Sequence, residues 1–138
     1  SYELGSKVSL FDRAVRWNSS LFYMNYGNLF NTLTIDGAFA VQVADARIYG
    51  LESELTWRIA PWLDVFANFG LIEADYVGNR PANLSERLQR APAFQGKTGF
   101  SVEKPTEGGT FLLNADLFYT SSYLVTPANP RSTAPLVP

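Results

Sequence analysis

The chain has 138 residues, of which 46% are hydrophobic and 14% aromatic, and it carries a formal net charge of −2 with neither cysteine nor histidine. This length suits one domain, and the missing residue types exclude disulfides, thiolate metal sites and a Ser-His-Asp triad. The acidic balance gives no electrostatic reason to expect nucleic acid as a partner, and no apolar run approaches the ~18 residues that a membrane helix needs.

Six stretches in which apolar and polar residues alternate predict β-strands, because successive side chains of a strand point to opposite faces. In chain order, these predicted strands cover residues 3–10, 15–24, 49–59, 63–71, 94–103 and 111–120. The third is the clearest, since Leu51, Leu55 and Trp57 share one parity and Glu52 and Glu54 share the other.

The connections between the predicted strands alternate between short and long. We expect tight turns at 11–13 and 60–62, a fairly short connection at 104–109, and long loops at 25–46 and 77–92. Residues 121–138 follow the last strand and are rich in proline. Outer-membrane barrels show this pattern, with short turns at the periplasmic end and long loops at the extracellular end.

Charge separates the two faces of these strands completely. The apolar parity holds no charged residue in any of the six, whereas the polar parity holds all of the strand charges. We expect the charged side chains to face a water-filled lumen: Glu3, Lys7, Arg16, Glu52, Glu54, Arg58, Asp64, Lys97, Glu103 and Asp116.

The length of the strands favours a membrane barrel over a soluble sheet. Strands of soluble proteins usually have ~5–6 residues, whereas about ten tilted residues span a bilayer. Six strands cannot close a barrel, which takes at least ~8, and open edges in lipid cost several kcal/mol per unpaired group. We therefore expect an all-β antiparallel meander of six long transmembrane strands, whose edges pair with other strands of the same barrel. A soluble β-domain that binds sugars stays an alternative.

Four segments resemble, in the right order, the barrel of TonB-dependent receptors. Residues 1–30 are similar to a recurrent hairpin through YELGSK, LFD and FYMNY, and residues 46–76 to the next hairpin through GLESE and the Trp before the turn. Residues 78–103 and 111–130 resemble the following loop and strands through GNRP, RAP and FYTSSY.

The resemblance implies a 22-stranded barrel with a plug domain inside it, of which this chain forms about a quarter. It also implies a bacterial outer-membrane receptor that imports a scarce nutrient, most often a ferric siderophore, with energy transduced by TonB. We expect residues 1–124 to be barrel and 125–138 a Pro-rich extracellular loop or truncated tail. We expect this piece to contact outer-membrane lipid, the remaining strands and the plug, to reach TonB only through a plug outside it, and to be inactive alone. A porin-like channel is the other alternative.

Six residues at the expected extracellular end are candidates for ligand contact, because arginine forks bind anions and aromatic rings stack on ligands. These are Tyr26, Phe30, Arg80, Arg87, Arg90 and Tyr123. Glu52 and Glu54 have a spacing that would suit a glycosidase pair. Because water or a plug also explains lumen charges, we expect no enzyme, no metal site and no cofactor.

Aromatic residues near the strand ends suggest the two interfacial girdles of a barrel. We expect Trp57 and Trp62 at the periplasmic boundary, and Tyr49 and Tyr76 at the extracellular one.

Overall fold

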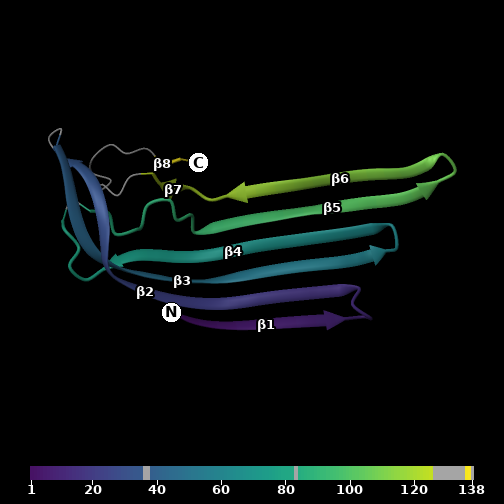
Figure 1. The fold of residues 1–138 in the computed structure, drawn as a ribbon, viewed down its shortest axis with the longest axis horizontal. Coiled ribbons are helices and arrows are strands. Elements are labelled where there is room, and N and C mark those ends of the chain that lie inside the picture. Colours follow the sequence, from purple (N-terminus) through teal and green to yellow (C-terminus); the bar gives the residue numbers. More distant parts are fainter. Residues whose placement is uncertain (36–37, 83, 126–135, 138) are drawn as a thin grey trace.

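A computed structural model describes residues 1–35, 38–82, 84–125 and 136–137 of the chain. Its main body is one antiparallel sheet in which each strand pairs with the next along the chain (Figure 1). The strands are β1 (Tyr2–Leu10), β2 (Val15–Ile35), β3 (Ala38–Ala60), β4 (Leu63–Val77), β5 (Phe94–Thr106) and β6 (Gly109–Thr120). Two short strands, β7 (Tyr123–Leu124) and β8 (Leu136–Val137), form a separate pair. Across the described residues, no helix is long and apolar enough to span a membrane.

All six predicted strands are present, and the predicted meander is confirmed. The connection predicted as a long loop at 25–46 is wrong, since β2 and β3 continue through it as one hairpin. The physical reason is a bulge between Tyr26 and Leu29, where Asn28 adopts a left-handed φ of 57°. Residues inserted at a bulge change the parity of everything beyond it, so a single period-two pattern cannot be followed across this point.

The register brings the predicted polar faces of all six strands together on one side of the sheet. One row runs across five strands through the pairs Lys7–Asn18, Asn18–Glu54, Glu54–Asn68 and Asn68–Lys97. Because pairing residues point to the same side of a sheet, all ten of the charged residues predicted for the polar parity fall on this face. Charged residues nearer the strand ends have the other parity: Asp45, Arg47, Glu73, Asp75 and Lys104. The other face carries most of the apolar side chains, such as Leu51, Leu55 and Trp57, although Leu112 lies on the charged face beside Glu103.

No second layer of the described chain covers the apolar face. Phe69 on the inner strand β4 remains 39% exposed, and Leu113 on the edge strand β6 remains 44% exposed. One polar group on this face is satisfied locally, since Trp17 Nε1 donates to Ser53 Oγ at 2.9 Å. An apolar face of this extent exposed to water would be unusual for a soluble protein.

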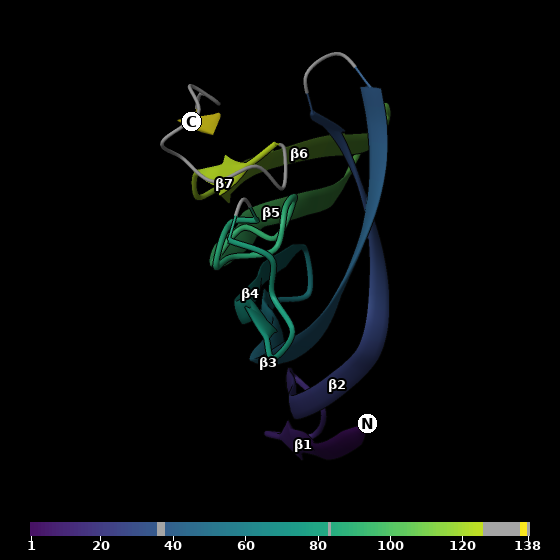
Figure 2. The ribbon, with the colours of Figure 1, turned by 90° about the vertical axis from the view of Figure 1, so that its left-hand side faces the viewer.

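The hairpin formed by the ends of β2 and β3 bends away from the sheet and lies over its concave side (Figure 2). The buried cluster of the molecule lies where this hairpin meets the end of β4 and the following loop. Its members are Ala44, Ala46, Tyr76 and Leu84. The predicted girdle position of Tyr76 is therefore wrong, because it pairs with Ala46 on the charged side of the sheet and is only 6% exposed.

Strands β1 and β6 form the two edges of the sheet, and neither has a second partner among the residues that the structure describes. Their free N–H and C=O groups need further strands in any lipid environment.

Candidate functional site

The concave, charged face forms an open groove of about 790 Å³ that is lined by residues from all six strands. On the same face, Arg58 and Asp64 form a bidentate pair with distances of 2.9 and 3.2 Å, and Lys97 Nζ lies 3.3 Å from Asp116 Oδ2. Lys97 also lies 5.7 Å from the centre of the Phe66 ring. These contacts tie neighbouring strands together across the face.

Other charges on this face have no ion-pair partner in the described part of the chain, namely Glu3, Lys7, Arg16, Glu52, Glu54 and Glu103. Glu54 accepts a hydrogen bond from Asn18 Nδ2 at 3.2 Å. Charged side chains without an ion pair in the sheet can interact with water or with a protein domain that lies against the charged face.

At the other end of the wall, Asp45 holds the base of the bent hairpin. Its Oδ1 accepts the backbone N–H of Asn28 at 3.0 Å, and its Oδ2 accepts from Asn79 Nδ2 at 3.4 Å. One carboxylate thus joins the bulge of β2 to the loop that follows β4. Tyr76 adds a second connection, because its hydroxyl donates to the buried Asn31 Oδ1. Tyr76 lies at the end of β4, beyond the segment predicted to span the membrane. Burial raises the pKa of Tyr76, so the phenol stays protonated and donates the hydrogen bond.

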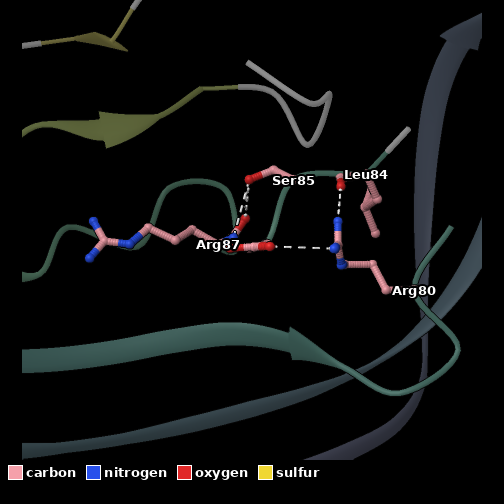
Figure 3. Close-up of polar contacts among 5 residues, drawn as sticks. Arg80, Leu84, Ser85 and Arg87 are labelled. Atoms are coloured by element: carbon pink, nitrogen blue, oxygen red, sulfur yellow. Dashed lines mark hydrogen bonds and ion pairs between the residues drawn. The ribbon is translucent and has the colours of Figure 1, made fainter. Parts of the chain in front are cut away.

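The loop after β4 folds back along that strand instead of extending into solvent. Tyr76 N donates to Glu86 O, and Leu88 N donates to Ala74 O. Within the loop, Arg80 Nη1 donates to Leu84 O at 2.6 Å and Arg80 Nη2 lies 3.6 Å from Glu86 (Figure 3). The side-chain contacts of Arg80 therefore stabilise the conformation of the loop.

Unlike Arg80, the remaining candidate arginines form no side-chain hydrogen bond or ion pair with the residues that the structure describes. Figure 3 shows the Arg87 side chain extending away from the loop, while its backbone exchanges hydrogen bonds with Ser85 Oγ. Arg90 is also exposed, and its backbone N–H donates to Leu124 O at 2.7 Å. This bond brings Arg90 beside Tyr123, and both line a hollow of about 700 Å³.

The hollow at Arg90 also includes residues of the charged face that the sequence analysis did not name as ligand candidates: Gln95, Phe118 and Thr120. Their parity on β5 and β6 could have indicated their face, and their positions near the start of β5 and the end of β6 could have indicated the end of the sheet that carries the long loops. The two hairpin candidates, Tyr26 and Phe30, lie elsewhere, on the bent hairpin, and are 45% and 73% exposed. Among the described residues, Arg90 and Tyr123 are thus the pair of candidates that line one hollow.

Comparison with protein families identifies the family to which this sheet belongs. The family model described as "TonB dependent receptor-like, beta-barrel" matches residues 1–135. The chain belongs to the TonB-dependent receptor β-barrel family. No solved structure matches the chain.

As a TonB-dependent receptor barrel, the chain lies in the bacterial outer membrane and takes part in TonB-dependent transport. The porin-like and soluble alternatives are set aside by the same match. In outer-membrane barrels with an apolar band on the outside and a polar interior, we expect the charged face of such a sheet to line the lumen and its apolar face to contact lipid. The family is one of transporters, and in the described ranges no group of three or more Asp or Glu residues gathers as a metal site.

Proposed function

We propose that the receptor imports a ferric siderophore and that this chain supplies barrel wall, lumen lining and part of the ligand mouth. In this proposal, residues 1–124 are barrel and 125–138 are an extracellular loop or a truncated tail. Most of that tail, 126–135 and 138, lies outside the described residues. The charged lumen residues without an ion pair, such as Glu52 and Lys7, then contact the plug domain or the water around it.

The hollow beside Arg90 is the observation that carries the ligand assignment. Arg90 is exposed and has no carboxylate partner within the described ranges, and Tyr123 lies in the same hollow. A guanidinium fork next to a phenol suits an anionic ligand rich in oxygen. Ferric siderophores that chelate iron through carboxylate or catecholate oxygens have this character. Iron is the cargo here and needs no ligand from the protein.

Arg87 supports the same ligand class in a weaker way. Its side chain is exposed on the extracellular loop and forms no ion pair within the described part of the chain. Phe30 and Tyr26 add exposed rings on the hairpin over the mouth, where flat parts of a chelate can stack. Arg80 is assigned a supporting role, since its contacts lie within the loop.

The test is equilibrium binding to the intact receptor in outer-membrane vesicles, with an anionic ferric catecholate, a neutral ferric hydroxamate, cobalamin and a maltooligosaccharide as probes. We expect an anionic ferric chelate to bind most tightly. Arg90→Gln should weaken its binding about tenfold or more, because hydrogen bonds to charged groups contribute about 1.5–3 kcal/mol.

Arg13→Gln is the matched control, since it removes the same charge at the exposed turn between β1 and β2, at the opposite end of the strands. It should leave binding within about twofold of the unsubstituted receptor. Tight binding of cobalamin or the oligosaccharide, with no ferric chelate bound, would contradict the siderophore assignment. Equal binding by the Arg90 and Arg13 variants would remove Arg90 from the site.

A further inference from the structure

The lipid-facing side of β1–β4 carries a shallow hollow of about 880 Å³ close to its extracellular end. Its floor is a row of leucines that pair in register across the four strands: Leu4, Leu21, Leu51 and Leu71. Three of them are more than 40% exposed. A continuous leucine floor of this kind fits acyl chains lying along the barrel wall.

A second row lies immediately on the extracellular side of the leucines and consists of tyrosines. Tyr2 pairs with Tyr23, and Tyr23 pairs with Tyr49. The rings of Tyr23 and Tyr49 are stacked with centroids 6.4 Å apart and planes inclined by 25°. Such rings have an apolar body and a polar tip, and they favour the boundary between acyl chains and headgroups.

A third row begins with Arg47, two residues from Tyr49 on the same face of β3. Its guanidinium carbon lies 5.7 Å from the centre of the Tyr49 ring, which fixes the orientation of the side chain. Arg47 Nε is buried and has no hydrogen-bond partner among the described residues. The guanidinium is thus held beside the apolar floor, and it forms no ion pair within the described part of the chain.

The height of Arg47 matches the headgroup region of the membrane. The stretch from Tyr49 to Ile59 spans about 33 Å along the strand at ~3.3 Å per residue. At a strand tilt of ~40° this is about 25 Å along the membrane normal, the height of the apolar band in outer-membrane barrels. Arg47 lies just beyond that band.

We propose that this corner of the barrel binds one phosphorylated, acylated glycolipid of the outer leaflet. Its acyl chains lie on the leucine row, its sugar lies against Tyr23 and Tyr49, and its phosphate accepts hydrogen bonds from Arg47. The carboxylates of Glu73 and Asp75 lie on the β4 side. The phosphate therefore binds on the β2 side, where Asn25 pairs with Arg47 and offers an amide donor. This binding is independent of the imported ligand.

The experiment is a titration of the delipidated intact receptor in detergent, followed by native mass spectrometry. The probes are lipid A with both phosphates, lipid A with both phosphates removed, and phosphatidylglycerol. We expect intact lipid A to bind at least about tenfold more tightly than either other probe. Arg47→Gln should lower its affinity about tenfold, and Arg47→Lys should lower it less, because lysine keeps the charge but loses the fork.

Arg16→Gln is the control, because it removes an equal charge from the lumen face of β2. Heat-modifiable migration in electrophoresis shows that each variant has folded. Unchanged lipid A affinity in a folded Arg47→Gln receptor overturns the proposal, as does equal binding of the dephosphorylated lipid. Equal or tighter binding of phosphatidylglycerol overturns the assignment to a glycolipid.

Discussion

Ala67→Arg is expected to destabilise the receptor by about 2–4 kcal/mol, the cost of an arginine on the lipid face near the middle of the membrane. Ala67 lies at the centre of the apolar parity of β4, between Leu55 on β3 and Thr98 on β5. Nothing in the described part of the chain covers this face, so the new guanidinium would lie in hydrocarbon. The free energy of unfolding in lipid vesicles, from a guanidinium titration, is the measurement.

Asn68→Arg provides the matched control at the next position of the same strand. Asn68 points to the opposite face and lies between Glu54 and Lys97 in register. A guanidinium there is solvated, with a carboxylate on one side and an ammonium on the other, so the expected change is within about 0.5 kcal/mol. Equal destabilisation by both substitutions would mean that the two faces share one environment.

Gly50→Ala is expected to cost about 1–3 kcal/mol, because a methyl group at this position has no space. The added Cβ would collide with the backbone carbonyl oxygen of Leu71 and lie 2.7 Å from Cζ of Phe22. The Phe22 ring lies across this glycine on the lumen face, opposite it in register. The midpoint of urea unfolding should fall, and less receptor should assemble into the heat-modifiable form.

Gly70 offers the same substitution on the same face without the obstruction. Gly70 on β4 pairs with Glu52, which is two residues from Gly50 on β3. A Cβ added at Gly70 would meet nothing within 4 Å. Gly70→Ala should therefore leave the unfolding midpoint unchanged or raise it slightly, since alanine reduces the entropy of the unfolded chain. A Gly50→Ala receptor as stable as the Gly70→Ala receptor would show that Phe22 and the β4 backbone yield easily.

The arrangement of the wall could be predicted from the sequence because strand parity is a local property. Each of the six strands shows its own alternation, so the common charged face followed once neighbours were assumed to pair. The hairpin at 25–46 could not be predicted in this way. Gly27 and Asn28 change the parity, and the strands beyond them are held by Asp45 and Tyr76, which lie far apart in the sequence.

Tyr76 and Arg90 illustrate two different limits of the sequence reading. The parity of Tyr76 agrees with Asn68 and Gly70, so its lumen-side position was readable, but its distance from the turn suggested a girdle. The proximity of Arg90 to Tyr123 had no local signal, since it depends on a backbone hydrogen bond from Arg90 to Leu124. Sequence spacing carries no information about such a contact.

The most direct measurement is a spin-label scan along β4 in the intact receptor, with one cysteine at a time placed from Leu63 to Leu71. The chain has no cysteine of its own. Collision rates with oxygen, which concentrates in lipid, and with a water-soluble nickel complex report the surroundings of each label. Labels at Leu63, Val65, Ala67, Phe69 and Leu71 should favour oxygen, and labels at the four positions between them should favour nickel. A profile without this alternation, or with every label shielded from oxygen, would contradict a wall that separates lipid from a polar lumen.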